Sequence, residues 1–207
     1  KLDYKMSEFG FIDELAAAAV YMACQQVDPY VDFSQFDNDS DGVVDMILMY
    51  YAGYNEAEGG PAASIWPHQF FVTALIPEQE KLDGVILDRY FCTSELKGNK
   101  GVTMCGIGTT CHEFAHSLGL PDMYDTNYNN EGDGLAGATY NYDLMSSGSY
   151  NNESRTPPWL NAEELFMLGW MDEITEISGE GDYTLTSIGA RNPAAFKMAA
   201  RDEGEYF

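Results

Sequence analysis

The stretch that decides the fold reads Thr110-Cys111-His112-Glu113-Phe114-Ala115-His116-Ser117-Leu118-Gly119-Leu120-Pro121-Asp122. It contains the pattern H-E-x-x-H, extended to H-E-x-x-H-x-x-G-x-x-D. On an α-helix, residues four apart lie about 40° apart around the axis and about 6 Å apart along it. His112 and His116 therefore present both imidazoles from one face, as two ligands of a tetrahedral zinc ion do.

The other residues of this motif complete a catalytic metal site. Glu113 lies about 100° round the helix from His112, so its carboxylate reaches a metal-bound water without ligating the metal, which is the position of a general base. Gly119 permits the left-handed conformation that ends a helix, and Pro121 prevents the helix from resuming. The chain then turns back, and Asp122 becomes the third ligand. Three protein ligands leave the fourth position open for water.

The motif has two other interpretations. A bare H-E-x-x-H also occurs by chance on a solvated helix face, but the chain has only three histidines and two of them are here. Thr110 and Glu113 could instead form a capping box that starts the helix at Thr110. An earlier start near residues 106–109 is favoured, because apolar residues continue through the motif at helical spacing.

A second motif follows a glycine-rich loop and reads Tyr142-Asp143-Leu144-Met145-Ser146-Ser147-Gly148-Ser149-Tyr150. It is similar to the Met-turn of metzincin zinc endopeptidases. The chain most closely resembles the immune inhibitor A family of secreted metallopeptidases. The resemblance rests on the run from His112 to Asp125, on the run from Tyr142 to Tyr150, on Ser64-Ile65-Trp66-Pro67-His68, and on Leu168-Gly169-Trp170.

The resemblance implies a secreted or cell-surface zinc endopeptidase that is made with a propeptide and acts on proteins or peptides. It implies His112, His116 and Asp122 as zinc ligands, Glu113 as the base, and Met145 beneath the ligands. Asp125 is also acidic and near, so it remains an alternative third ligand. In a metzincin-like fold, the strand just before the zinc helix would be the edge that pairs with substrate.

The expected architecture is mixed α/β (α+β), a metzincin-like fold of two lobes with a mixed sheet. Residues 1–119 form an upper lobe with the zinc helix, residues 120–170 form a lower lobe with the Met-turn, and residues 171–207 begin a β-rich segment. Hydrophobic periodicity predicts helices at 7–26 and 162–168. It predicts strands at 43–52, 85–93 and 183–187, and a Gly/Asn/Asp loop at 122–141.

Composition limits the possible partners. The net charge of −24 makes binding to nucleic acid or to an anionic membrane improbable. No run of eighteen apolar residues exists, so no membrane-spanning segment is expected. The chain begins in polar sequence and ends as a strand-like stretch starts, which predicts a part of a longer exported protein. Nothing in the sequence predicts its oligomeric state.

The segment Asp37-Asn38-Asp39-Ser40-Asp41-Gly42-Val43-Val44-Asp45 is typical of a calcium loop. Its oxygen ligands would come from the carboxylates at positions one, three, five and nine and from the main chain of Val43, with glycine at the sharp turn. Position twelve is Leu48 instead of the bidentate glutamate of an EF-hand, and a strand is predicted to follow. The alternative is a solvated Asp-rich turn.

The remaining candidates are single residues. His68 follows Trp66 and either lines the cleft or is a structural histidine. Tyr142 and Tyr150 flank the Met-turn, and either could donate to an oxyanion. Cys92 and Cys105 could form a disulfide in an exported protein, while buried free thiols are equally expected for these and for Cys24 and Cys111.

The function predicted from the sequence is zinc-dependent hydrolysis of peptide bonds, in which Glu113 assists the attack of a zinc-bound water. The main alternative is a calcium-stabilised interaction module with a vestigial zinc site. The intact Glu113 argues against that alternative. A zinc hydrolase of non-peptide amides is a third interpretation, which only an assay separates.

Overall fold

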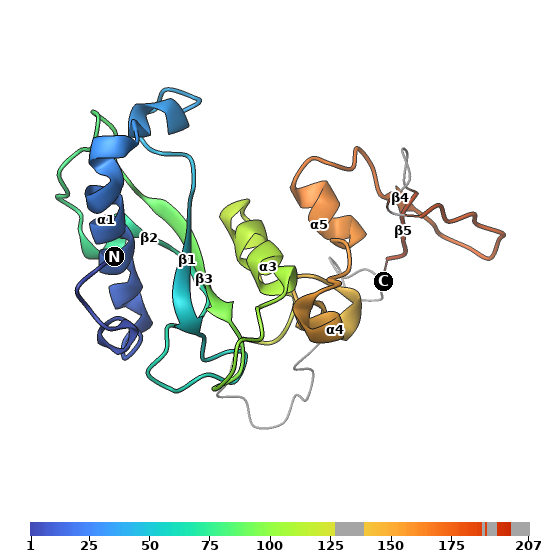
Figure 1. Ribbon diagram of the computed structural model, residues 1–207. Coiled ribbons are helices and arrows are strands. Elements are labelled where there is room, and N and C mark those ends of the chain that lie inside the picture. Colours follow the sequence, from blue (N-terminus) through green and yellow to red (C-terminus); the bar gives the residue numbers. More distant parts are fainter. Residues whose placement is uncertain (127–138, 188, 190–193, 200–207) are drawn as a thin grey trace.

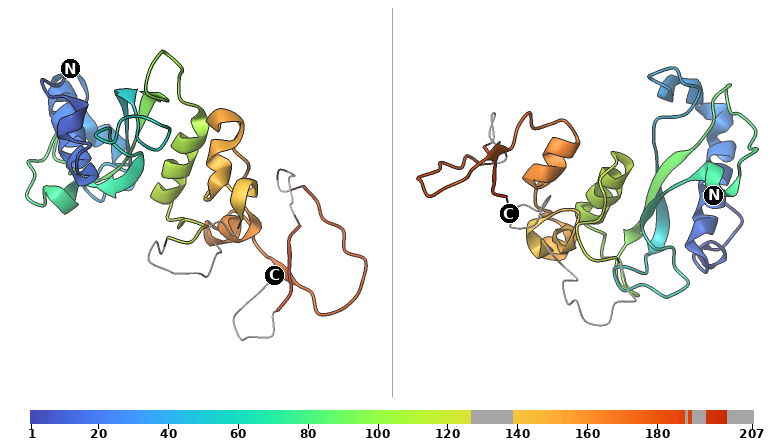
Figure 2. Two further views of the ribbon diagram at one scale, coloured as in Figure 1. Left: turned by 90° about the horizontal axis from the view of Figure 1, so that it is seen from below. Right: turned by 180° about the vertical axis from the view of Figure 1, so that it is seen from behind.

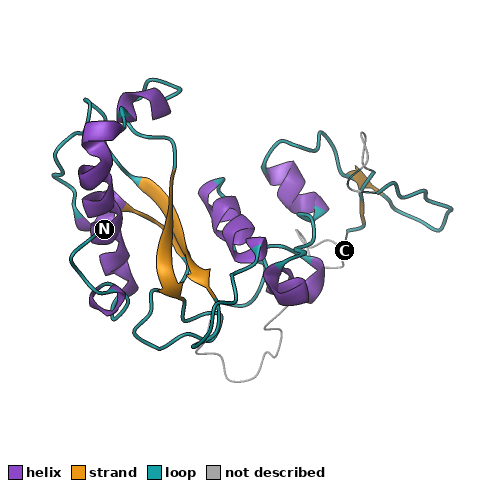
Figure 3. Cartoon of the chain, in the orientation of Figure 1, coloured by secondary structure: helices purple, strands orange, loops and turns teal. Residues whose placement is uncertain are grey.

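A computed structural model of the chain describes residues 1–126, 139–187, 189 and 194–199. Figure 1 shows helix α1 on one side of a twisted sheet and helix α3 on the other, with helices α4 and α5 beyond α3. The two further views in Figure 2 agree on this order. Most of the remaining chain is loop (Figure 3). The architecture is mixed α/β, as the sequence predicts.

The sheet has three strands in the order β1-β3-β2. Strands β1 (Ile47–Tyr54) and β3 (Arg89–Leu96) run parallel, and β2 (His68–Phe71) pairs antiparallel with β3. The strand before the motif helix is therefore central, because β1 and β2 cover its two edges. The expectation that this strand is the substrate-pairing edge is wrong, and the edge nearest α3 is β2.

Helix α1 (Ala16–Val27) is shorter than the helix predicted for residues 7–26. Two 3-10 turns, η1 (Met6–Glu8) and η2 (Asp13–Leu15), precede it. The reason lies at Gly10, which packs directly on the loop before β2: a Cβ there would lie 2.5 Å from the main-chain nitrogen of Ile65. This contact holds the segment in a non-helical path.

The strands also begin later along the chain than predicted. Residues 43 and 86 form only an isolated parallel bridge, so the strands predicted from 43 and from 85 begin four residues later, at Ile47 and Arg89. Residues 183–187 form no strand, because no described neighbour pairs with them. The C-terminal sheet consists of β4 (Thr175–Glu176) and β5 (Phe196–Lys197).

Helix α3 (Ile107–Ser117) carries the motif, and Gly106 is its N-cap residue. The earlier start is confirmed, and the capping box at Thr110 is excluded. The smaller elements are η3 (Asp28–Tyr30), η4 (Phe33–Phe36), α2 (Val72–Leu75), η5 (Tyr140–Tyr142), η6 (Ser147–Tyr150), α4 (Asn151–Ser154) and α5 (Ala162–Met167).

Two apolar clusters stabilise the described residues. One lies between α1 and the sheet, and its largest buried side chains include Tyr90, Ile65 and Leu87. The other lies beyond α3 and joins Ala115 to Met145, Leu165 and Met171. Helix α3 thus separates the two clusters. The lobe boundaries at residues 119 and 170 stay a prediction.

The start of α3 packs tightly on the end of the second motif and on the segment that follows it. A Cβ at Gly108 would lie 1.9 Å from the carbonyl oxygen of Ser149, and a Cβ at Gly106 would lie 2.1 Å from that of Ser154. Such distances are far below van der Waals contact, so only glycine fits at either position. The two glycines bring the second motif against the helix that carries the first.

Candidate metal centre

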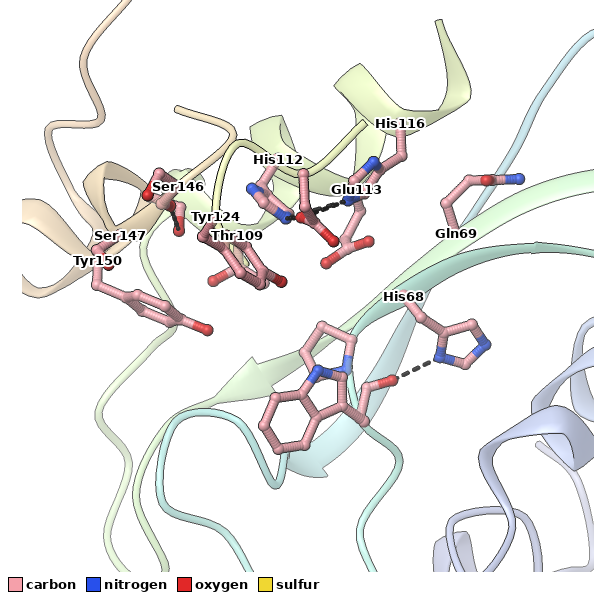
Figure 4. Close-up of a pocket in the computed structure, with 14 residues that line it drawn as sticks. His68, Gln69, Thr109, His112, Glu113, His116, Tyr124, Ser146, Ser147 and Tyr150 are labelled. Atoms are coloured by element: carbon pink, nitrogen blue, oxygen red, sulfur yellow. Dashed lines mark hydrogen bonds and ion pairs between the residues drawn. The ribbon is translucent and has the colours of Figure 1, made fainter. Parts of the chain in front are cut away.

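The motif residues of α3 and the loop after it converge on one point. His112 Nε2 and His116 Nε2 are 3.2 Å apart, and Asp122 Oδ1 lies 3.2 Å from each of them. They form one of the two groups of metal-binding side chains among the described residues. The group lines a cavity of about 370 Å³ (Figure 4). Asp125 is not part of the group.

The turn after α3 brings Asp122 to the histidines. The helix ends at Ser117, and Gly119 has φ +103°, which is the left-handed conformation. The N–H of Leu120 then donates to the carbonyl of Ala115 at 3.2 Å, which closes the helix end as a Schellman motif does. The reversal predicted at Gly119 is therefore present.

A main-chain carbonyl orients each imidazole. His112 Nδ1 donates to the carbonyl of Leu144 at 2.8 Å, and His116 Nδ1 donates to that of Leu120 at 2.7 Å. In the neutral rings the proton is on Nδ1, so both Nε2 atoms carry lone pairs. Three electron-pair donors thus face one another without a hydrogen between them.

Such an arrangement needs a cation. Burial is the largest influence on the pKa of both imidazoles and lowers it. The hydrogen bond to Asp122, the main-chain carbonyl on each ring and the charge of Glu113 together outweigh burial, so the net direction for each imidazole is upward. The two rings in turn hold the pKa of Asp122 well below its usual range despite its burial. A metal ion bound between the three side chains would take the place of the proton that an imidazole needs for its hydrogen bond to Asp122. Zinc fits, because its tetrahedral ligand atoms at about 2.0–2.1 Å from the ion lie about 3.3–3.4 Å apart.

Glu113 is buried on the same helix, and Figure 4 shows its side chain beside His116. Burial raises the pKa of its carboxyl, whereas the two imidazoles and the main-chain N–H of Gln69 lower it; the net direction is upward. A carboxyl with a raised pKa is suited to accept and return a proton near neutral pH. Gln69 belongs to β2, so the edge strand and Glu113 lie together.

The second motif contributes to the same place. Met145 is fully buried in the apolar cluster that contains Ala115 of α3. Ser146, Ser147, Ser149 and Tyr150 line the cavity. Tyr142 does not, and its side chain is 90% exposed. Of the two tyrosines proposed from the sequence, the structure brings only Tyr150 to the site, and Figure 4 shows its hydroxyl pointing into the cavity.

His68 lines the cavity, but both of its ring nitrogens are engaged. Nδ1 lies 2.6 Å from the carbonyl of Trp66, and Nε2 lies 2.9 Å from the hydroxyl of Tyr90. Burial lowers the pKa of this imidazole, so the neutral form is favoured. These contacts are those of a structural histidine.

Several lining residues were missed from the sequence. Tyr124, Gln69 and Thr109 line the cavity, and the hydroxyls of Thr109 and Ser146 are buried with no hydrogen-bond partner among the described residues. Tyr124 and Thr109 adjoin the motif, so their nearness along the chain was the available signal. Gln69 carried none, because its position depends on the pairing of β2.

The cysteines are all free. Cys92 Sγ lies 3.7 Å from His68 Nδ1, whereas Cys105 Sγ lies 3.2 Å from the hydroxyl of Ser94. The disulfide considered for Cys92 and Cys105 is absent because the two thiols have different neighbours. Burial raises the pKa of the Cys105 thiol to about 11.

The second group of metal-binding side chains is in the Asp-rich loop. Carboxylate oxygens of Asp37, Asp39 and Asp45 lie within 4.8 Å of one another. Asp37 accepts hydrogen bonds from the N–H groups of Asp41 and Gly42, and Asp41 is not part of the group. Val43 pairs with Ile86 across the bridge to the strand region. The rest of the acidic loop after Asp122, residues 127–138, lies outside the described residues.

Comparison with known proteins gives a family match over most of the chain. The model of the immune inhibitor A peptidase M6 catalytic domain matches residues 16–163, which is most of the chain. The chain belongs to the immune inhibitor A peptidase M6 family. The matched range includes the sheet, α3, Asp122 and the segment of Met145.

Individual relatives are more distant. Immune inhibitor A of Bacillus thuringiensis subsp. alesti is 29% identical over 146 residues, covering 60% of this chain and 20% of that protein. Pre-pro-metalloprotease PrtV of Vibrio cholerae serotype O1 (strain M66-2) is 28% identical over 160 residues, covering 67% of this chain and 15% of that protein. The chain thus spans a fifth or less of these relatives. Among its described residues, no helix has the length and apolar composition that crossing a bilayer requires.

Proposed function

We propose that this chain is the catalytic domain of a zinc-dependent endopeptidase. The observation that carries the proposal is the convergence of His112 Nε2, His116 Nε2 and Asp122 Oδ1, each 3.2 Å from the other two, beside a buried Glu113. The family of the chain and the names of its relatives support the same class. His112, His116 and Asp122 would hold the ion, which when bound would supply Lewis-acid polarisation of the scissile carbonyl and activation of water.

The residues of the chain have separate roles in this mechanism. Glu113 accepts the proton of the attacking water and returns it to the leaving amine. Leu144 and Leu120 keep the two imidazoles in the tautomer that presents Nε2. Tyr150 is suited to donate a hydrogen bond to the developing oxyanion, because it lines the cavity and its hydroxyl points into it (Figure 4).

The substrate edge is proposed to be β2 instead of β3. β2 is an edge strand, and the main-chain N–H of its Gln69 acts on Glu113. A peptide that lies in extended form along this strand would pass in front of the catalytic group. We also propose that this chain is exported and made with a propeptide, because the Vibrio relative is named a pre-pro-metalloprotease.

The experiment that tests the function is a metal analysis paired with a cleavage assay on casein, an unstructured protein. We expect one zinc per chain at the motif site, cleavage of casein, loss of both with a zinc chelator, and recovery on adding zinc. Zinc without cleavage of casein or of small amides would favour the alternative of an interaction module. Cleavage of small amides alone would favour a non-peptide hydrolase.

We further propose calcium in the Asp-rich loop, at Asp37, Asp39 and Asp45, with the main chain of Val43 as an oxygen donor. Three carboxylates within 4.8 Å repel one another, and a bound cation relieves the repulsion. Asp41 is retained as a ligand through water or through movement of its side chain.

Calcium removal gives a prediction. A chelator selective for calcium over zinc should lower the melting temperature by about 5–10 °C. Calcium at about 100 times its Kd would raise the melting temperature of a protein of this size by about that much, and the chelator removes this gain. Asp39→Ala should have the same effect and then be insensitive to the chelator. Asp3→Ala, which removes an exposed carboxylate elsewhere, should behave like wild type. An unchanged wild-type melting temperature would identify a solvated turn.

A further inference from the structure

Two carboxyl groups that the proposed mechanism does not use are buried together, one in the second motif and one in α5. Asp143 is 1% exposed and Glu164, in the first turn of α5, is fully buried. The two side chains are hydrogen-bonding neighbours. Among the described residues, neither forms an ion pair with lysine or arginine. A pair of buried acids without a cation needs another means of neutralisation.

The donors available to the pair leave one oxygen without a partner. Asp143 Oδ1 accepts from the N–H of Met145 at 2.8 Å, and Asp143 Oδ2 accepts from the Asn161 amide at 2.7 Å. Glu164 Oε2 accepts from the N–H of Asn161 at 2.6 Å. Glu164 Oε1 is buried and receives no donor. Because ionised carboxyls only accept, a proton between Glu164 and Asp143 satisfies both.

The pair is linked through the main chain to two of the proposed zinc ligands, His112 and Asp122. Asp143 holds the segment 143–145 through its side chain and through its carbonyl, which accepts from Gly148 at 3.0 Å. Within that segment, the carbonyl of Leu144 holds the ring of His112. The carbonyl of Met145 accepts from the N–H of Met123 at 2.7 Å, next to Asp122.

We propose that Asp143 and Glu164 share one proton and act as a positioning pair, which fixes the Leu144 and Met145 carbonyls and so the orientation of the ligands His112 and Asp122. The role in orienting ligands rests on the proposed function. The shared proton does not depend on the proposed function. Burial and the Asp143 carboxylate raise the pKa of Glu164 to about 7, while His112 of α3 opposes this. Glu163, the neighbouring acid of α5, is exposed.

The pair predicts a pH-dependent stability. A carboxyl whose pKa is raised in the folded state stabilises the fold below its unfolded pKa, near 4.5, and this contribution is lost as the pH rises to about 7. Glu164→Gln keeps a donor to Asp143 but does not titrate. We therefore compare the melting temperature of Glu164→Gln with that of wild type at each pH. The difference should shift in favour of Glu164→Gln by about 5 °C or more between pH 4.5 and 7, and then level off.

The experiment compares zinc-loaded wild type, Glu164→Gln, Glu164→Ala and the control Glu163→Gln at one fixed free zinc concentration. Infrared difference spectra at pH 6 should show that wild type and Glu163→Gln carry one carbonyl stretch of a protonated carboxylic acid that Glu164→Gln lacks. Zinc affinity, measured against a competing chelator, should fall about 10–100-fold in Glu164→Ala and be largely restored in Glu164→Gln.

The outcomes separate the parts of the proposal. Absence of the infrared band, or a melting difference that does not change with pH, would overturn the shared proton. Zinc affinity within twofold of wild type in Glu164→Ala would overturn the positioning role. If Glu164→Ala does not fold, the restored affinity of Glu164→Gln and the pH comparison still decide. None of these measurements needs peptidase activity, so failure of the proposed function is seen separately in the casein assay.

Discussion

Replacement of Glu113 by glutamine should abolish peptide hydrolysis while zinc binding and the fold are kept. The glutamine side chain has nearly the same shape, but its amide cannot accept the proton of the attacking water. Loss of a general base costs about 10²–10⁴-fold in turnover, and we expect at least this effect. The measurement is kcat on a casein-derived peptide, with zinc content and melting temperature determined on the same sample.

The matched control is Glu163→Gln, which makes the same chemical change at an exposed position of α5 and should leave kcat unchanged. More than a tenth of wild-type turnover in Glu113→Gln would contradict the assignment of the base. Loss of zinc together with activity would instead make Glu113 a ligand, in conflict with its exclusion from the group of His112, His116 and Asp122.

The second large effect is expected at Asp122. Asp122→Ala removes the carboxylate that lies 3.2 Å from both Nε2 atoms and leaves two ligands. Residues that only orient a ligand cost about 10–100-fold in metal affinity, so loss of the ligand itself should exceed about 100-fold. Competition with a zinc chelator measures the change directly.

Asp125→Ala is the control for this prediction, because Asp125 is the alternative third ligand and lies three residues away. Its carboxylate is not among the group that converges on the site, so zinc affinity should stay within a few-fold of wild type. If zinc affinity instead fell strongly in Asp125→Ala and stayed near wild type in Asp122→Ala, Asp125 would be the third ligand.

Sequence periodicity located the main elements but not their ends. The helix of the motif and α5 were predicted within a few residues, because each has a glycine or polar N-cap and a continuous apolar stripe. The helix predicted for residues 7–26 begins nine residues before α1 does, since the contact of Gly10 with residues 63–65 is not visible along the chain. The order β1-β3-β2 could not be derived either, because three short strands allow several pairings.

The zinc ligands could be predicted from the sequence because their geometry is local. A spacing of four residues on a helix puts His112 and His116 on one face wherever that helix lies, and Gly119 permits the turn that returns Asp122. The position of Glu113 follows from the same helix. None of these relations depends on how the rest of the chain packs.

Only the tertiary structure decided what surrounds those ligands. The carbonyl that holds His112 belongs to Leu144, the edge strand beside Glu113 is β2, and Tyr150 reaches the cavity while Tyr142 faces solvent. The contact of Asp143 with Glu164 likewise joins positions twenty-one residues apart. Such contacts depend on packing between segments distant in sequence, and periodicity within a segment carries no information about them.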